Sequence, residues 1–455
     1  MNDTTIKDID IYARHRFLCR CGKTHEMPIG KVVIRAGAAS ELPERVAELG
    51  FGKKGLLVTD EIIYESLGKD IYHGWKQAGL DIDLFVLKGR VIPDEEAVGQ
   101  VVCNVPFDAE YIVSIGGGTV TDIVRYVTTR LGLPEVSIPS AMTMDGFFTN
   151  MSVIIINGLQ RTYYLDYPTL ILADTDIIAK APAHMNAAGV GEVISKISAG
   201  LDWYAANLIK DIYYCDAAAD MMGQCISEGT SSETIAGIPH GDAKAVLNLT
   251  DALYKSAVGM AWYGSSPCGS GAEHQLNHFW IKCQDDKGAK QSMHGQAVGV
   301  GAVVNLMIWE ELLGLDLELL DFEKALSSAP TKEEWEQGVK RVYGDGAKDI
   351  LDVQKNNHFF DRESRRRELQ RIVQNAGKLR RKFESIPSAD EISAMLGAVG
   401  APNRPQQLNI DKQELLDSIY YAKEMRRGRY NALWMAETLG VLDAVAERVS
   451  GRLGY

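Results

Sequence analysis

The sequence predicts two domains of different classes, an α/β domain near the N-terminus and an all-α domain that follows it. Between residues 31 and 140, short β-branched or aliphatic runs alternate with helical stretches, which is typical of parallel strands joined by helical crossovers. From about residue 180 the strand signal disappears and amphipathic helical periodicity dominates. A chain of 455 residues also exceeds what one hydrophobic core usually organises.

The first domain is expected to be Rossmann-like, an open parallel sheet with helical crossovers. The expected strands are 31–37, 55–60, 82–87, 111–119 and 136–140. The expected helices between them are 42–50, 71–79 and 97–105. In the second domain, helical periodicity is clearest in 193–209 and at the C-terminal end. We predict an N-terminal extension at 1–30, a nucleotide-binding α/β domain at 31–178 and a helical domain at 179–455.

Composition and charge exclude several classes of function. The formal net charge of −13 argues against a dominant affinity for nucleic acid or anionic lipid, and favours small-molecule chemistry. No apolar run reaches the ~20 residues that a bilayer span needs, and the N-terminus lacks the pattern of a secretory signal. Seven scattered cysteines fit reduced thiols. We therefore expect a cytoplasmic protein without membrane or nucleic-acid partners.

A glycine-rich turn is the first candidate for ligand binding. Gly116, Gly117 and Gly118 follow the apolar run YIVSI, and Thr119 begins the helical pattern TVTDIVRYVTT. Glycine N–H groups at a helix N-terminus suit a cofactor pyrophosphate, although the triplet lacks the usual dinucleotide spacing and also fits a simple tight turn. Asp60, at the end of its strand, is placed either to meet an adenosine ribose or to cap the next helix.

The second half of the chain offers ligands for a divalent metal. Glu192 points away from the apolar face of its helix, where an ion pair with Lys196 is the simpler explanation. His274 and His278 are four residues apart and share one helical face, and His294 follows in the next motif. Imidazoles and a carboxylate suit Zn²⁺ with one position open for substrate. Spacing alone leaves open whether the histidine pair or a set containing His294 binds the metal.

A second group of possible ligands lies near the N-terminus. Cys19, Cys21 and His25 could supply three ligands to zinc. The sequence offers no fourth ligand nearby and the spacing is irregular. It therefore favours an N-terminal extension that packs on the body of the protein.

Six motifs occur in an order that is far more specific than any one of them. They are GGGTVTDIVRY, IPSAMTMDGF, AAGVGEVISKISAGLDW, GAEHQLNHFW, MHGQAVGVG and RRGRYNAL. Together they resemble the sn-glycerol-1-phosphate dehydrogenases, in particular the bacterial branch, in a superfamily that includes glycerol dehydrogenase, iron-dependent alcohol dehydrogenases and dehydroquinate synthase. The resemblance implies a dehydroquinate synthase-like fold. It also implies NAD or NADP as cofactor and one divalent metal, zinc before nickel or iron.

The resemblance assigns roles to individual residues. It selects Glu192, His274 and His294 as metal ligands and leaves His278 as a group that contacts substrate or relays a proton. Lys196 matches a lysine of the dehydrogenase pattern and stands where the iron-dependent relatives have a fourth, histidine ligand. A cationic Lys196 could also help to bind a phosphate.

The same resemblance assigns the residues around the cofactor. They are Gly116, Gly117, Gly118, Thr119, Asp122, Ser140, Thr143 and Asp145. Asp145 is implied to lie beside both the nicotinamide and the substrate, where it could act in catalysis.

The chain also departs from the pattern at positions that bear on the substrate. Glu192 stands where the glycerol-phosphate enzymes normally carry aspartate, whereas dehydroquinate synthase uses glutamate there. The chain lacks the Gly-Gly-Lys of that synthase. Asp166 replaces a basic residue that is often found in the dehydrogenases.

These inferences lead to a specific expected reaction, the reversible reduction of dihydroxyacetone phosphate to sn-glycerol 1-phosphate. The proton reaches the alkoxide through metal-bound water, His278 or Asp145, and the sequence does not choose among them. Lys196 and Arg161 are candidates for binding the substrate phosphate. The alternatives are a dehydroquinate synthase-like lyase, another polyol or ketose dehydrogenase, or a catalytically idle homologue. We expect a homo-oligomer, dimeric or larger.

Overall fold

The structure is a computed structural model that describes residues 11–52, 54–157, 159–355, 360–426 and 429–455. It divides into two compact units. Unit 1 consists of Met1–Val190 and Gly223–Gly264, and unit 2 of Gly191–Met222 and Ser265–Tyr455. Two of the three boundaries fall within helices α7 (Ala183–Lys210) and α8 (Asp216–Gly229), and the third lies between Gly264 and Ser265. The three-part division of the chain that the sequence suggests stays a prediction.

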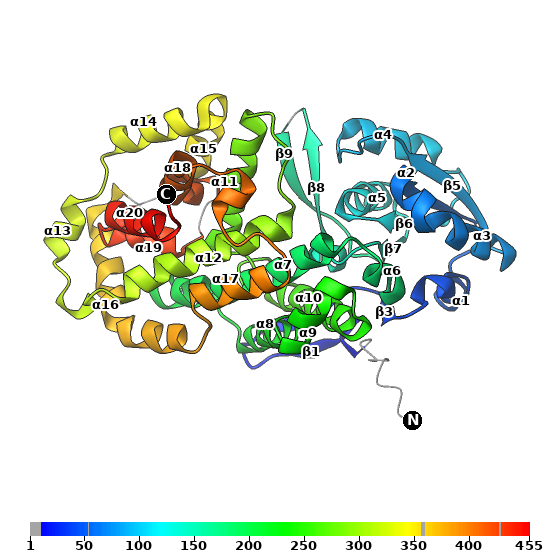
Figure 1. Cartoon of the computed structure of the whole chain (residues 1–455), viewed down its shortest axis with the longest axis horizontal. Coiled ribbons are helices and arrows are strands. Elements are labelled where there is room, and N and C mark those ends of the chain that lie inside the picture. The colour runs from blue at the N-terminus through cyan, green and yellow to red at the C-terminus, as the bar shows by residue number, and fades with distance from the viewer. Residues whose placement is uncertain (1–10, 53, 158, 356–359, 427–428) are drawn as a thin grey trace. The chain divides into compact units, whose positions relative to one another are not determined.

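Unit 1 is built on a parallel sheet of six strands (Figure 1). Its order is β3-β10-β7-β6-β4-β5, and every neighbouring pair is parallel. The strands are β3 (Lys31–Arg35), β4 (Lys54–Asp60), β5 (Asp81–Leu87), β6 (Tyr111–Gly116), β7 (Glu135–Pro139) and β10 (Leu170–Asp174). The central strands β10, β7 and β6 are buried along their whole length, as parallel strands covered on both faces should be.

Helices cover both faces of this sheet. The helices of this layer are α1 (Leu42–Glu48), α2 (Glu61–Ile63), α3 (Lys69–Gln77), α4 (Glu95–Asn104) and α5 (Gly118–Leu131). One apolar cluster joins the sheet to α1 and α3, and another joins it to α4 and α5. Consecutive residues of β4 alternate between them, with Leu57 in the first cluster and Leu56 and Val58 in the second.

The order of the strands creates a switch point between β4 and β6. These strands are neighbours, with Val58 opposite Ser114, but the chain leaves β4 towards β5 on one side and β6 towards β7 on the other. In open parallel sheets the crevice at such a point, outside the carboxyl ends of the strands, is where ligands bind. Asp60 ends β4 and Gly116 ends β6, so both lie at this point.

Two small hairpins and several helices complete unit 1. The hairpins pair β1 (Arg16–Leu18) with β2 (Thr24–Glu26), and β8 (Met151–Ile156) with β9 (Leu159–Tyr164), both antiparallel. The additional helices are α6 (Thr175–Ala179), α9 (Ser232–Gly237) and α10 (Ala243–Tyr263), with the short 3-10 helix η4 (Asp145–Phe148).

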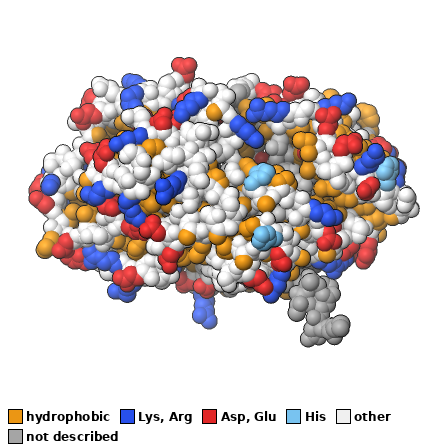
Figure 2. Space-filling view, viewed as in Figure 1, with side chains coloured by type: hydrophobic (Ala, Val, Ile, Leu, Met, Phe, Trp, Pro, Cys, Tyr) orange, Lys and Arg blue, Asp and Glu red, His pale blue; other side chains and the backbone are white. Residues whose placement is uncertain are grey.

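The described part of unit 2 is helical. Besides parts of α7 and α8, its helices are α11 (Ala272–Asp286), α12 (His294–Leu313), α13 (Phe322–Ser327), α14 (Lys332–Tyr343), α15 (Ala347–Gln354), α16 (Arg362–Glu384), α17 (Ala389–Ala398), α18 (Lys412–Tyr421), α19 (Ala432–Thr438) and α20 (Leu442–Arg452). Figure 2 shows charged side chains of both signs interspersed on the visible face of the molecule. The arginine-rich segment of α16 forms ion pairs with acidic neighbours, for example Arg362 and Arg366 with Glu323.

Helix α12 alone among the described helices is long and apolar enough to cross a membrane by composition, with a mean hydropathy of 1.2. Its apolar window is 83% buried within the fold. It packs against α11 and α17, and its first residue is His294. The helix is therefore a core element of unit 2.

The predicted fold class, an α/β region followed by a helical region, is confirmed by this architecture. The two hairpins and β10 are not among the strands that the alternation pattern identified. The strands of the first hairpin have only three residues each, too few to show a period-two pattern.

Candidate metal and cofactor sites

Glu192, His274 and His294 lie together in unit 2. Glu192 belongs to α7, His274 to α11, and His294 begins α12. One donor atom of each residue lies within 4.8 Å of the others. Nε2 of His294 is 3.3 Å from Oε2 of Glu192, and Nε2 of His274 is 3.7 Å from Oε1. Glu192 is fully buried, whereas the His294 side chain is 34% exposed and accessible to a small ligand.

Glycines let the three helices approach closely enough to form this cluster. A side chain on Gly191, which precedes Glu192, would collide with the backbone of Gly295 on α12. A side chain on Gly301 would lie 2.7 Å from the carbonyl oxygen of Glu273 on α11. These backbone contacts explain the glycines of the motifs GVGE and HGQAVGVG, because only glycine permits such close approach.

The two carboxylate oxygens of Glu192 have different surroundings. Nζ of Lys196 donates to Oε1, which is the ion pair expected from the helical spacing, and also donates to the carbonyl of Gly269 at 3.1 Å. Oε2 is buried and accepts no hydrogen bond from a described residue. Burial acts to raise the pKa of Glu192, but Lys196 and the two histidines outweigh it and hold the pKa well below its usual value. A buried carboxylate oxygen without a donor is costly, and a divalent cation would satisfy it.

Glu273 orients the first histidine of the cluster. Its Oε1 is 2.9 Å from Nδ1 of His274, which leaves Nε2 directed towards Glu192. The other oxygen, Oε2, accepts a hydrogen bond of 2.9 Å from the hydroxyl of Ser198. A carboxylate behind a histidine fixes the tautomer whose Nε2 lone pair is available to a metal.

Asn277 plays the corresponding part for the second histidine. Its Nδ2 lies 3.1 Å from Nδ1 of His294, and its Oδ1 is buried without a partner among the described residues. An imidazole that binds a metal through Nε2 carries its proton on Nδ1. A half-turn of the Asn277 amide would let Oδ1 accept that proton and would satisfy the buried oxygen.

His278 lies one turn after His274 on α11 but contacts a cation. Nη2 of Arg426 donates to its Nε2 at 2.8 Å, because a guanidinium can only donate. Burial, followed by the charge of Arg426, holds the pKa of His278 well below its usual value. His278 is therefore a neutral imidazole with its proton on Nδ1.

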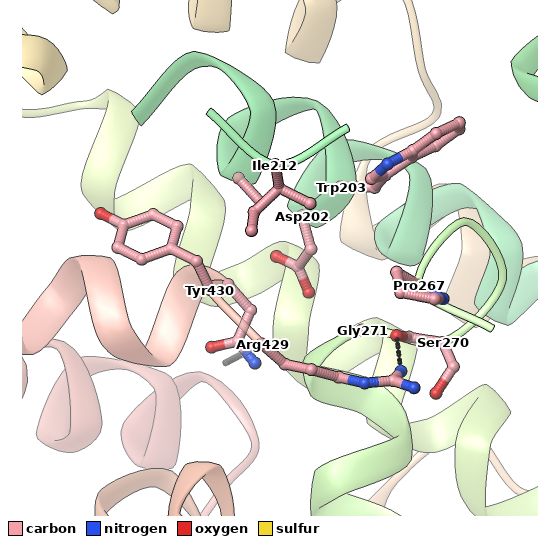
Figure 3. Close-up of a pocket in the computed structure, with 10 residues that line it drawn as sticks. Asp202, Trp203, Ile212, Pro267, Ser270, Gly271, Arg429 and Tyr430 are labelled. Atoms are coloured by element: carbon pink, nitrogen blue, oxygen red, sulfur yellow. Dashed lines mark hydrogen bonds between the residues drawn. The ribbon is translucent and has the colours of Figure 1, made fainter. Parts of the chain in front are cut away.

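A small cavity lies elsewhere in unit 2, beside Arg429 (Figure 3). Its volume of about 40 Å³ has room for ordered water but not for a nucleotide. Arg429 donates to the carbonyl of Ser270 at 2.7 Å, drawn as a dashed line in Figure 3, and to Oγ of Ser266 at 2.8 Å. Asp202, on the same cavity, accepts hydrogen bonds from the backbone N–H of Ala272 and from the side chain of Trp309. These bonds hold the framework of α11 and α12 rather than a ligand.

In unit 1, the glycine turn connects β6 to α5 at the switch point of the sheet. Helix α5 has Gly117 at its N-cap and no side chain that caps it. A side chain on Gly117 would meet no atom within 4 Å, whereas one on Gly118 would collide with the end of Met144. The uncapped helix start therefore has open space beside Gly117, where an anion can approach.

Among the other cofactor candidates of unit 1, Ser140 contacts this turn. The backbone N–H of Ser140 donates to the carbonyl of Gly116 at 2.9 Å, so the ends of β6 and β7 lie side by side. Thr143 follows in the same loop, and Asp145 begins η4. Asp145 is buried, and its Oδ2 accepts a hydrogen bond of 2.6 Å from Ser256 on α10. Asp122 lies on α5, one turn into the helix.

The remaining residues of unit 1 that the sequence singled out are Asp60, Arg161 and Asp166. Asp60 caps α2, with Oδ1 accepting from the N–H of Ile63 at 3.0 Å, although its place at the switch point also suits a ribose. Arg161 lies on β9 and Asp166 follows that strand, and both are exposed. The structure gives neither residue a contact with the other candidates in unit 1.

The sequence did not identify three residues that the structure brings to the metal cluster. Glu273 and Asn277 lie inside the motif GAEHQLNHFW, and Arg426 begins RRGRYNAL. The signal for Glu273 and Asn277 was their helical spacing around His274, with one beside it and the other three residues on. No local pattern could have paired Arg426 with His278, because 148 residues separate them.

Comparison with known proteins gives consistent relationships. The model of the family described as iron-containing alcohol dehydrogenase matches residues 33–182. The chain is 26% identical over 441 residues to a glycerol-1-phosphate dehydrogenase (NAD(P)+) of Geobacillus stearothermophilus, covering 96% of this chain and 98% of the relative. It is 30% identical over 301 residues to the protein of that name from Halalkalibacterium halodurans, covering 63% of this chain and 72% of the relative.

The fold is shared with solved structures. A probable glycerol dehydrogenase from Sinorhizobium meliloti 1021 matches with a TM-score of 0.60 and 16% identity, covering 93% of this chain and 97% of that one. One of the sequence relatives matches over nearly its full length. The chain belongs to the glycerol-1-phosphate dehydrogenase family.

Proposed function

We propose that this protein is a metal-dependent NAD(P)-linked oxidoreductase that interconverts dihydroxyacetone phosphate and sn-glycerol 1-phosphate. The observation that supports it best is the convergence of Glu192, His274 and His294, with a buried carboxylate oxygen left unsatisfied for a cation. The relatives named glycerol-1-phosphate dehydrogenase support the substrate and the cofactor. Two nitrogen ligands and one oxygen ligand suit catalytic zinc, with nickel or iron as alternatives.

The dinucleotide is proposed to bind at the switch point of unit 1. Its pyrophosphate would lie against the N-terminus of α5 beside Gly117, where N–H groups and the helix dipole favour an anion. Asp60 at the end of β4 would face the adenosine ribose. Ser140, Thr143 and Asp145 would line the nicotinamide side, and the choice between NAD and NADP stays open.

When bound, the metal supplies a Lewis acid for the ketone and the nicotinamide supplies the hydride. The protein's own residues prepare the site before either arrives. Glu273 and Asn277 set the tautomers of the two histidines, and Lys196 holds one oxygen of Glu192 while leaving the other free. The charge of Lys196 also keeps Glu192 ionised, because it opposes the effect of burial on the pKa.

Arg426 is the better candidate for the substrate phosphate in unit 2. Lys196 is buried and already donates to Glu192 and Gly269, which leaves it less free to bind a second anion. Arg426 donates through Nη2 to His278, one turn along α11 from the ligand His274. A guanidinium presents its N–H donors in a planar fork whose geometry matches the oxygens of a phosphate.

Two described residues are candidates for contacting the alkoxide. His278 is neutral and carries its proton on Nδ1, so it can donate a hydrogen bond to the alkoxide oxygen, but giving up that proton would leave an imidazolate. Asp145 is buried and held by Ser256, which orients its carboxyl group. We propose His278 as the hydrogen-bond donor to the alkoxide, because Arg426 fixes its tautomer, while the proton itself comes from water.

The test is a substrate panel on purified protein of known metal content. NADH and NADPH absorbance is followed with dihydroxyacetone phosphate, dihydroxyacetone and other ketoses. We expect net cofactor oxidation that requires a bound divalent metal and is much faster with dihydroxyacetone phosphate than with unphosphorylated ketoses. Activity on unphosphorylated ketoses alone would contradict the proposed substrate, and turnover without net cofactor oxidation would favour a synthase-like lyase.

A further inference from the structure

A short hairpin near the N-terminus brings two cysteines and a histidine together. Strands β1 and β2 pair with Phe17 opposite His25. The turn between them is tight, with the N–H of Cys19 donating to the carbonyl of Lys23 at 2.9 Å and that of Gly22 donating to Cys19 at 3.0 Å. Gly22 has a φ of +85°, a left-handed conformation that favours glycine. The turn therefore has one defined backbone conformation that places both cysteines at its tip.

The donor atoms of this hairpin are close enough to share one ion. The Sγ atoms of Cys19 and Cys21 and a ring nitrogen of His25 lie within 4.8 Å of one another. Sγ of Cys21 is 3.4 Å from Nε2 of His25. Tetrahedral zinc with Zn–S distances of about 2.3 Å and Zn–N distances of about 2.0 Å separates its ligand atoms by less than 4 Å, so only a small contraction is needed.

The imidazole is already held in position by its neighbours. His25 is 1% exposed, and its ring stacks on Trp262 of α10 and meets the edge of Phe17. Phe17 also packs edge-on against Trp262, with ring centroids 5.0 Å apart. These contacts orient Nε2 towards Cys21, so the apolar surroundings present the histidine to the sulfur atoms.

The hairpin is a small element, and a bound metal would reinforce its packing on α10. Its strands have three residues each, and a two-stranded hairpin of this size is marginal in water without another source of stability. Cysteine and histidine are the usual ligands of structural zinc, which contributes directly to folding free energy.

We propose that Cys19, Cys21 and His25 bind a structural zinc ion that is separate from the catalytic metal. Three residues leave one tetrahedral position, which either another cysteine of the chain or a water molecule fills. The two metals differ in chemistry, because the hairpin offers sulfur ligands and the Glu192, His274 and His294 cluster offers only nitrogen and oxygen. This difference makes the proposal testable without any mutation and independently of the proposed reaction.

The first experiment is zinc X-ray absorption on the intact wild-type protein, reduced, loaded with excess zinc and then desalted. We expect more than one zinc per chain and a shell of sulfur scatterers at about 2.3 Å, together with nitrogen and oxygen near 2.0 Å. The sulfur number also identifies the fourth ligand: averaged over two zinc ions per chain, about 1.5 sulfur atoms per zinc would indicate another cysteine and about 1 a water. Zinc-loaded protein without a sulfur shell would overturn the proposal.

The second experiment compares cysteine variants. Cys21→Ser and His25→Gln should each lose one equivalent of zinc and lower Tm, while retaining the metal at Glu192. The matched control is Cys103→Ser, because Cys103 is exposed on α4 and lies outside the hairpin. Serine variants of Cys215, Cys225, Cys268 and Cys283 test which cysteine, if any, supplies the fourth ligand.

The absorption spectrum of cobalt-substituted protein gives a further readout that includes the wild-type chain, for the case in which a variant fails to fold. Cobalt bound by thiolates has a strong near-ultraviolet charge-transfer absorption, which nitrogen and oxygen ligands do not produce. We expect this band in wild type and in His294→Ala, and its loss in Cys21→Ser. Full zinc content and an unchanged cobalt band in Cys21→Ser would contradict the assignment.

Discussion

The two groups of candidate ligands differ in how the chain assembles them. Cys19, Cys21 and His25 belong to one hairpin, and a local turn suffices to bring them together. Glu192, His274 and His294 come from three helices of unit 2 and meet only when that unit has folded. We propose that the cysteine hairpin needs its metal for stability. The Glu192, His274 and His294 cluster, by contrast, is positioned by the surrounding helices and hydrogen bonds before a metal binds. The contrast is that of a structural site and a catalytic one.

The sharpest test of the helical group is to remove its carboxylate. Glu192→Gln keeps the size of the side chain but loses the charge that a divalent metal and Lys196 both need. Loss of Lewis-acid stabilisation is worth several kcal/mol, so we expect turnover to fall by about 10³-fold or more and metal content to fall with it. Exposed Glu65→Gln is the control. Full activity with full metal content would contradict the assignment of Glu192 as a metal ligand.

A smaller effect is expected from changing a residue that orients a ligand without binding the metal itself. Glu273→Gln leaves the three ligands intact but weakens the control of the His274 tautomer. Partners of this kind typically contribute about 10-fold to 100-fold in metal affinity. Chelator competition should therefore show a weaker site with unchanged metal identity. Unchanged affinity would mean that the helices alone organise the site.

The substrate phosphate provides a test that leaves the metal untouched. A charge-assisted hydrogen bond contributes about 1.5–3 kcal/mol, so Arg426→Ala should raise KM for dihydroxyacetone phosphate about 10-fold to 100-fold. The effect should be absent with dihydroxyacetone, which has no phosphate. Arg367→Ala, an exposed arginine on α16, is the matched control. Equal losses on both substrates would argue against a phosphate contact.

The fold class and the metal candidates were predictable from the sequence for different reasons. Apolar patterning revealed the parallel strands, because buried strands and amphipathic helices leave periodic signals. The choice of His294 over His278 needed the family resemblance, since both histidines fit the local spacing. The structure separates them by a physical contact, as His278 receives a hydrogen bond from Arg426 while His294 faces Glu192.

Other features depend on contacts between distant segments and left no local signal. The unsatisfied oxygen of Glu192, the contact of Arg426 with His278 and the stacking of His25 on Trp262 all belong to this kind. Asp60 shows the opposite case, because both of its predicted roles remain compatible with the structure. It caps α2 and also ends β4 at the switch point.

The proposed nucleotide site of unit 1 can be tested by adding a single methyl group. A methyl group on Gly117 meets no protein atom, so Gly117→Ala should fold normally, yet it occupies the space proposed for the pyrophosphate. We expect Kd for the dinucleotide to rise about tenfold, equivalent to ~1.4 kcal/mol, with Tm unchanged. Calorimetric titration with NADH and NADPH measures this. Normal nucleotide affinity would place the pyrophosphate elsewhere.

The smallest expected effect is on the pH dependence of stability. The pKa of His278 lies well below its usual value of 6.5, so the unfolded chain takes up a proton that the folded protein does not. Stability from this residue is present above pH 6.5 and is lost as pH falls below it, by at most about 1.4 kcal/mol per pH unit. Denaturant unfolding between pH 5 and 7 should show a weaker dependence in His278→Gln, with exposed His240→Gln as the control.

The most direct test of the central claim is anomalous diffraction at the zinc absorption edge from crystals of the zinc-loaded protein. The account predicts an anomalous peak bonded to Glu192, His274 and His294 at about 2.0–2.2 Å, with Glu273 and Asn277 hydrogen-bonded behind the histidines. It also predicts a second peak at Cys19, Cys21 and His25. A fully loaded crystal whose metal lies away from Glu192 would contradict the assignment of the catalytic site.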